Sequence, residues 1–282
     1  MTAWRLTIAT VLAAFVAMSP TLVAQWPSYP TPGVPRAADG TPVLDAPTPR
    51  TPDGKVDFSG IWQRGGGGGG GRGRGGPPAP TTTPDGIPLS GFGEVAGRGY
   101  QLPLQPWAAE LKKKRMADNS KDNPDVWCLP IGLMQYHNHP QPRQIVQTKS
   151  LMLMTYESNY GLRYIYMDGR PAPANDPTPW WFGYSRGWFD GDALVVETTN
   201  FLGDERAGWL DVNGSPYTDA LKMTERFRRP NFGTLEIDAT IDDAKAYTKP
   251  FTVRVNQRIM VDQEMIEFIC NENERSTQHI AK

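Results

Sequence analysis

Two glutamates stand among apolar residues at the spacing of a β-strand. Glu225 shares the face of a predicted strand with three apolar side chains, and Glu272 follows a similar apolar run at 266–270. A carboxylate in an apolar row costs free energy unless it is protonated or paired with a cation. Two carboxyl groups whose pKa values are pushed apart can act as acid and base. The alternative is a buried Glu–Arg pair joining strands, with Arg163 or Arg170 as the partner of Glu225.

An aromatic cluster follows the Pro-rich segment 171–179. Trp180 and Trp181 lie where this loop enters a predicted strand, and Tyr184 follows them. Aromatic rings at the mouth of a barrel bind sugar faces or aromatic ligands, and core packing is the alternative. Arg170 lies at a turn and is a candidate anchor for an anion. In an enzyme, Arg170 or Tyr184 would stabilise developing charge.

His137 and His139 are two of the three histidines in the chain. In an extended segment their side chains would face the same way, as in a metal chelate. The sequence shows no third ligand beside them. We therefore favour a solvent-facing loop at this position, and we expect no metal and no other cofactor.

The segment that must position these residues is rich in short strands separated by turns. From residue 125 onwards, β-branched, aromatic and Met residues alternate with turn signals, including Asp190-Gly191, a strong two-residue hairpin signal. We predict strands at 144–148, 151–157, 162–167, 182–189, 193–199, 222–228, 234–241, 251–261 and 265–270. Close spacing predicts an all-β domain over 125–282, an antiparallel meander in a closed or nearly closed β-barrel, with a β-sandwich as the alternative.

The preceding residues 25–124 have a different composition. The chain has 29 glycines and 27 prolines in 282 residues, and many of them lie in this segment, including the glycine tract 65–76. Such a composition predicts a disordered Gly/Pro-rich extension. Within it, 57–62 is a strand-like patch and 107–116 is a short predicted helix. The balanced charge, 29 basic against 30 acidic residues, argues against a nucleic-acid partner.

Residues 1–24 have the pattern of a secretory signal peptide. Arg5 precedes a short apolar run at 6–18, and an acceptable cleavage site precedes Gln25. We expect a periplasmic or secreted protein with no membrane span after cleavage, and an uncleaved anchor is the alternative. In an oxidising compartment the only two cysteines, Cys128 and Cys270, predict one disulfide, with two buried free thiols as the alternative.

Six short motifs together resemble a large, uncharacterised family of secreted bacterial proteins. They include a Gly-x-Ser-x-Gly-Trp hairpin and a Cys-Asn-Glu-Asn sequence, and they lie at 57–62, 145–148, 166–170, 183–198, 224–227 and 270–273. The resemblance implies export but carries no established activity. Family members often have histidine where this chain has Ala172, Tyr184, Ser215 and Tyr217, so any chemistry based on those imidazoles would be altered here.

Two functions fit these features. The first is a binding protein that takes a small aromatic or carbohydrate ligand against Trp180, Trp181 and Tyr184. The second is a cofactor-independent hydrolase, lyase or isomerase that uses Glu225 and Glu272 as an acid/base pair. A structural envelope protein without a pocket is a third possibility. The state of Glu225 separates these functions, because an enzyme requires an accessible carboxyl group, whereas a binding protein or a purely structural role predicts a closed arginine pair. The sequence does not indicate an oligomeric state.

Overall fold

The computed structural model describes residues 29–65, 81–173 and 178–272. The predicted signal segment 1–24 and most of the glycine tract 65–76 lie outside these residues, as does the end of the Cys-Asn-Glu-Asn motif.

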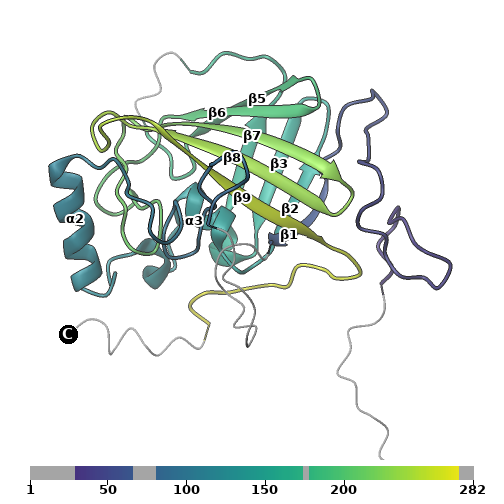
Figure 1. Ribbon diagram of the computed structural model, residues 1–282, viewed down its shortest axis with the longest axis horizontal. Helices are drawn as coiled ribbons and strands as arrows, with labels where there is room; N and C mark the ends of the chain where they lie inside the picture. The colour runs from purple at the N-terminus through teal and green to yellow at the C-terminus, as the bar shows by residue number, and fades with distance from the viewer. Residues whose placement is uncertain (1–28, 66–80, 174–177, 273–282) are drawn as a thin grey trace, which may run out of the picture.

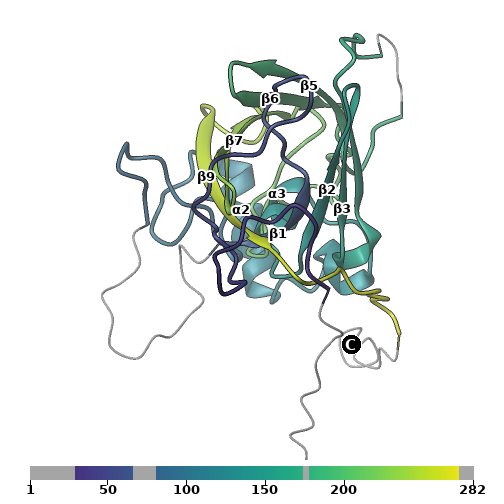
Figure 2. The ribbon, with the colours of Figure 1, turned by 90° about the vertical axis from the view of Figure 1, so that its right-hand side faces the viewer.

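The described chain forms one closed barrel of nine strands, which confirms the predicted barrel over the sandwich (Figures 1 and 2). The strands follow one another around the ring in chain order, and β1 pairs with β9 to close it. Their bounds are β1 Gly60–Arg64, β2 Arg143–Gln147, β3 Leu151–Tyr156, β4 Leu162–Tyr166, β5 Tyr184–Asp190, β6 Ala193–Thr199, β7 Lys222–Asn231, β8 Thr234–Asp242 and β9 Phe251–Met260.

Eight predicted strands correspond to β2 through β9, but the ninth is wrong. Residues 265–270 follow an irregular path, because β1 already occupies the free edge of β9. The chain turns away at Asp262, which has a positive φ of 58°. The strand-like patch at 57–62 therefore contributes the closing strand.

One pair of neighbouring strands departs from the predicted antiparallel meander. β4 and β5 run parallel, with Ile165 opposite Ser185 and Tyr166 opposite Arg186. The connection 167–183 is long enough to return the chain to the end of the barrel from which β4 started. Every other neighbouring pair is antiparallel.

The described parts of the Gly/Pro-rich extension pack on the barrel. Val56, Phe58 and Trp62 are buried in the core, and Leu89 bridges to Arg254 on β9. The predicted helix is present as α2, Pro106–Ala117, outside the barrel (Figure 1). Residues 29–65 and 81–124 are therefore ordered, in contrast to the predicted disorder of the extension.

A second helix, α3, Leu133–Asn138, lies at one end of the barrel and was not predicted. All six of its residues are buried. Arg143 on β2 donates to the His137 carbonyl at 2.6 Å, and the amide of Gln257 on β9 lies 3.5 Å from the same oxygen. The helix is therefore fixed to the two strands that flank β1, at the end of the barrel (Figure 2). Short 3₁₀ turns at Pro124–Trp127 and Ser158–Tyr160 flank it.

Candidate functional site

A stripe of polar side chains crosses four neighbouring strands on the inside of the barrel. Arg163 lies on β4, Ser185 on β5, Thr198 on β6 and Glu225 on β7, and each is at most 1% exposed. Because side chains alternate along a strand, each of these residues faces inwards while its neighbours face out. Ser185 lies directly opposite Thr198, so the stripe is continuous.

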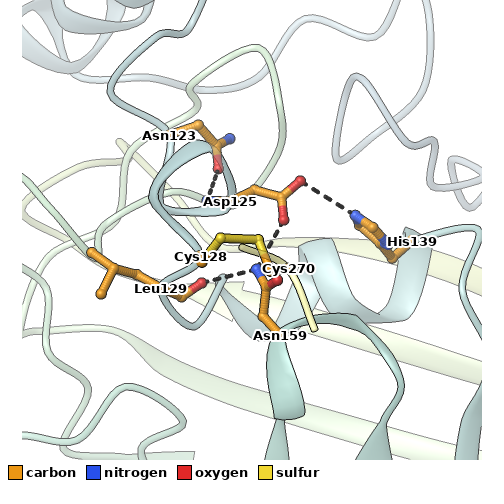
Figure 3. Close-up of a disulfide and its surroundings, with 7 residues drawn as sticks. All are labelled: Asn123, Asp125, Cys128, Leu129, His139, Asn159 and Cys270. Atoms are coloured by element: carbon orange, nitrogen blue, oxygen red, sulfur yellow. Dashed lines mark hydrogen bonds and ion pairs between the residues drawn. A yellow bond between two sulfur atoms is a disulfide. The ribbon is translucent and has the colours of Figure 1, made fainter. Parts of the chain in front are cut away.

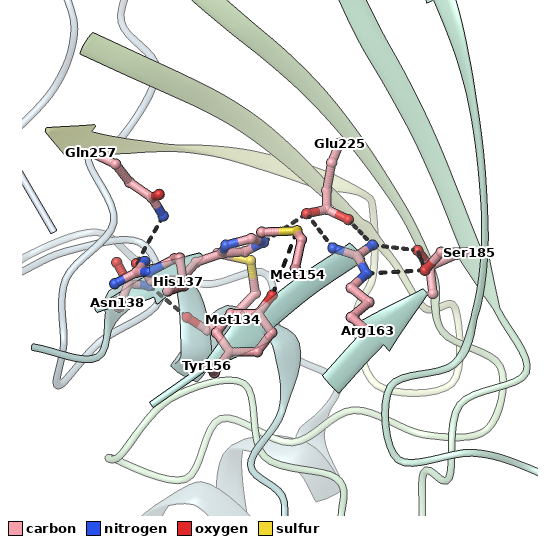
Figure 4. Close-up of polar contacts among 11 residues, drawn as sticks. Met134, His137, Asn138, Met154, Tyr156, Arg163, Ser185, Glu225 and Gln257 are labelled. Carbon is pink, nitrogen blue, oxygen red and sulfur yellow. Dashed lines mark hydrogen bonds and ion pairs between the residues drawn. The ribbon is translucent and has the colours of Figure 1, made fainter. Parts of the chain in front are cut away.

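Both carboxylate oxygens of Glu225 are occupied (Figure 4). Oε1 lies 2.7 Å from Nε2 of His137 on α3 and accepts from Nη1 of Arg163 at 3.1 Å, while Oε2 accepts from Nη2 of the same arginine. The Arg163 guanidinium also donates to Ser185 at 3.0 Å and to Thr198 at 2.8 Å. The carboxylate is thus held by a bidentate arginine, the strongest geometry for such a pair.

The pKa values in this network follow from burial and pairing. Burial alone would raise the pKa of Glu225, but the Arg163 charge and the His137 hydrogen bond outweigh it and lower the pKa to about 2. Burial lowers the pKa of His137, although Glu225 opposes this. His137 is therefore neutral and donates from Nε2, because an ionised carboxylate only accepts. Its Nδ1 is buried without a hydrogen-bond partner among the described residues.

The predicted catalytic glutamates are not brought together as an acid/base pair. Glu225 is fully buried in a closed pair with Arg163, the first of its two predicted partners. Glu272 is exposed in the irregular segment after β9. The predicted apolar face of 266–272 does not exist, because these residues do not form a strand. The proximity of His137 to Glu225 was not predicted, since nothing in the sequence places α3 against the end of the barrel.

The two candidate metal ligands bind different carboxylates. His137 contacts Glu225, whereas Nε2 of His139 lies 3.5 Å from an oxygen of Asp125. The extended geometry assumed for the pair and the favoured solvent-facing loop are both wrong, because His137 lies in α3, His139 caps its end and both are buried. Among the described residues, no three potential metal-binding side chains of His, Cys, Asp or Glu gather at one point.

Aromatic rings form a connected row on the outside of β4 and β5. Tyr164 stacks on Tyr166 with ring centroids 6.5 Å apart, and Tyr166 stacks on Tyr184 at 5.2 Å. Trp180 meets the Tyr184 ring edge-on at 5.7 Å. Tyr164 is 45% exposed and Trp180 is 38% exposed, whereas Tyr166 between them is half-buried and Tyr184 is buried. We call Tyr164, Tyr166, Tyr184 and Trp180 the aromatic face.

Arg170 completes the aromatic face rather than the interior network. Its guanidinium lies 4.1 Å from the centroid of the Tyr166 ring, a cation–π arrangement, and it pairs with Asp168 at 2.6 Å. The hydrogen bonds that Arg170 donates to Asp168 raise the pKa of the guanidinium. Trp181 is half-buried and makes no ring contact with the other aromatic residues of the face. Tyr164 and Tyr166 were not predicted as site residues, although their strand period places them on one face.

The predicted disulfide between Cys128 and Cys270 is present and joins positions 142 residues apart (Figure 3). It ties the irregular segment after β9 to the 3₁₀ turn Pro124–Trp127. Asp125 in that turn accepts a hydrogen bond from Asn159 at 2.9 Å and lies beside His139. The disulfide therefore fastens the C-terminal segment to a polar cluster outside the barrel wall.

Four positions, at which the family with resembling motifs often has histidine, lie in different surroundings. Tyr184 belongs to the aromatic face, and Ala172 follows Arg170 in the 167–183 connection. Ser215 is buried and donates to Asp211 at 2.6 Å. The Tyr217 hydroxyl is buried without a partner among the described residues.

Comparisons with known proteins identify no family and no relative. No protein-family model matches the chain, and no significant match was found among curated proteins or among solved structures. In the described part of the chain, no helix has the length and apolar character to cross a bilayer.

Proposed function

We propose that this protein binds carbohydrate on the aromatic face. The observation that carries the proposal is the connected row of rings from Tyr164 to Trp180 on the outer side of β4 and β5, whose two end rings are exposed. Exposed aromatic rings stack on the apolar faces of sugar rings and lose little side-chain entropy when they do so.

Polar groups at the edge of the aromatic face supply the hydrogen bonds that a sugar needs. Arg170 and Asp168 lie beside Tyr166, one as a donor and the other as an acceptor, and both are partly exposed. Stacking combined with donors and acceptors at one edge suits a sugar with several hydroxyl groups. A row of rings, rather than a single ring, suits an oligosaccharide. A small aromatic ligand would leave the polar edge unused.

An acid/base enzyme has less support. Glu225 is ionised, fully buried and hydrogen-bonded at both oxygens to Arg163 and His137, so it has no proton to donate and is not accessible to a substrate. A general acid or base must reach the proton that it transfers. The interior network is better explained as a structural element.

We also propose that the protein acts outside the cytoplasm. The 1–24 segment has the pattern of a signal peptide, the motifs resemble those of secreted proteins, and the disulfide fits an oxidising compartment. In such a place a carbohydrate-binding surface would meet cell-wall or environmental glycans.

Calorimetric titration with glycans tests the proposal. Hexasaccharides of glucose, xylose and N-acetylglucosamine are titrated into the purified protein and into Tyr164→Ala, with Tyr100→Ala as the control because Tyr100 is also exposed and lies in the segment before α2. We expect at least one hexasaccharide to bind, and its affinity to fall at least tenfold in Tyr164→Ala only. Absence of binding for all three at millimolar concentration, or an equal loss in both variants, would overturn the proposal.

A further inference from the structure

A cavity of about 440 Å³ lies outside the barrel, between α2 and two loop segments. One wall is α2, another is the 3₁₀ turn Pro124–Trp127, and the third is the loop segment 205–209 between β6 and β7. Its volume lies within the range of sites for small molecules. None of the residues that line it belongs to the interior network or to the aromatic face.

The apolar part of the cavity is built around two tryptophans. Trp127 lines it and is 46% exposed, while Trp209 lines it from a buried position. Leu111 of α2 adds an aliphatic surface. An exposed tryptophan beside a cavity is available to pack on the apolar body of a ligand.

The floor of the cavity is held rigid by Arg115. Its guanidinium lies 3.9 Å from the centroid of the Trp209 ring and donates to the carbonyls of Gly208, Gly214 and Glu205. These bonds join α2 to the β6–β7 loop. The cavity is therefore framed by fixed elements, which reduces the entropy lost when a ligand binds.

Charges of both signs surround the apolar part. Lys114 and Lys121 line the cavity with their ammonium-bearing side chains, and Asp118 and Asp122 line it with carboxylates. All four residues are exposed, so they are available to a ligand. With Arg115, Arg206 and Glu205, which also line it, the cavity has four basic and three acidic residues, so a ligand with a single charge would meet several like charges. A ligand carrying both charges meets a partner for each.

We propose that this cavity binds a small zwitterion with an aromatic body, such as a free aromatic amino acid. Asp118 and Asp122 hold the ammonium group, Lys114 and Lys121 hold the carboxylate, and the ring packs against Trp127. This site is independent of the carbohydrate proposal, because the two share no residue.

Three related probes test the need for both charges. L-phenylalanine carries both, 3-phenylpropanoate lacks the ammonium group, and 2-phenylethylamine lacks the carboxylate. Each is titrated into the purified protein at neutral pH by calorimetry. We expect L-phenylalanine to bind at least tenfold more tightly than either analogue. If none of the three binds at millimolar concentration, or if an analogue binds as well as the amino acid, the proposal is wrong.

Two tryptophan variants place the binding in the cavity. Trp127→Ala removes the proposed ring contact, and Trp107→Ala is its matched control, because Trp107 is also 46% exposed but does not line the cavity. We expect Trp127→Ala to weaken L-phenylalanine binding at least fivefold and Trp107→Ala to leave it unchanged. Equal effects in the two variants would contradict the assignment. Hexasaccharide titration of Trp127→Ala distinguishes the two proposals, since glycan binding should persist whether or not L-phenylalanine binds.

Discussion

The interior network and the aromatic face lie on opposite sides of the same strands. Arg163 points into the barrel from β4, whereas its neighbour Tyr164 points out, and on β5 Ser185 and Tyr184 divide in the same way. Inside, each oxygen of Glu225 has a partner from the chain itself. Outside, the rings of Tyr164 and Trp180 keep a large exposed surface.

This difference separates a structural role from a binding role. A buried charged group whose bonding capacity is filled by its neighbours stabilises only the folded state, and removing one partner leaves the other uncompensated. An exposed ring contributes little to folding because water reaches it in both states. Position on one side or the other of a single strand thus decides what a residue does.

Glu225→Gln is expected to have the largest effect on stability. The substitution leaves the Arg163 cation buried without its counter-charge, which should lower the free energy of unfolding by about 3–5 kcal/mol. Urea denaturation measures this loss. The double variant Arg163→Met/Glu225→Leu is the control and should recover part of the stability, because it removes both charges. A Glu225→Gln protein as stable as the parent would contradict the structural role.

Removing the disulfide is expected to have the next largest effect. Cys128→Ser/Cys270→Ser opens a link between positions 142 residues apart and should lower the free energy of unfolding by about 2–4 kcal/mol. The bond lies outside the barrel, so it tests whether an exterior feature can also be structural. We expect hexasaccharide affinity to be unchanged in the folded variant. A loss of affinity without a loss of stability would reverse this interpretation.

The pH dependence of stability reports on the interior network. The pKa of His137 is lowered in the folded protein, and that of Glu225 is lowered from 4.5 to about 2, so the unfolded chain binds more protons in both cases. The free energy of unfolding should therefore decrease as the pH falls below about 6.5, with the Glu225 contribution lost between pH 4.5 and 2. Urea titrations across this range measure it. In Glu225→Gln the decrease between pH 4.5 and 2 should become shallower, and an unchanged slope would exclude Glu225 as its source.

Tyr164→Ala is expected to have the smallest effect on stability. Because the ring is 45% exposed, the free energy of unfolding should change by less than about 1 kcal/mol. Glycan affinity should nevertheless fall tenfold or more, which is the opposite of the behaviour expected of the interior variants. Thermal and urea unfolding, measured beside the glycan titrations, would detect a loss of stability large enough to explain the loss of binding.

The sequence was most informative where alternation along one strand decides the outcome. The period of two in 221–227 placed Glu225 inwards and left two interpretations, a catalytic acid or a partner of a buried arginine. The structure has the second, with Arg163, one of the two candidate partners. The choice between Arg163 and Arg170 depends on where β4 ends and the loop begins. The cysteine pair was predicted because the chain contains no other cysteine.

Features that depend on distant contacts could not be predicted. α3 has only six residues, so its helical period is too short to recognise, and its place beside Glu225 is set by contacts from β2 and β9. The pattern at 266–272 resembles a strand, but the edge that it would need is taken by β1. The cavity beside α2 joins segments about 100 residues apart, from Leu111 to Trp209 along the chain.

The number of strands has a consequence for the outer surface. Directions that alternate around a closed ring return to their starting sense only when the number of strands is even, so a ring of nine must contain a neighbouring pair with the same direction. In this barrel the mismatch falls between β4 and β5. The chain must then travel the full height of the wall between them, and that passage carries Arg170 and Trp180 over the tyrosines. Because the number of strands is odd, the chain needs a long connection between two parallel strands, and this connection contributes Arg170 and Trp180 to the proposed sugar site. A barrel with one strand fewer would not need such a connection.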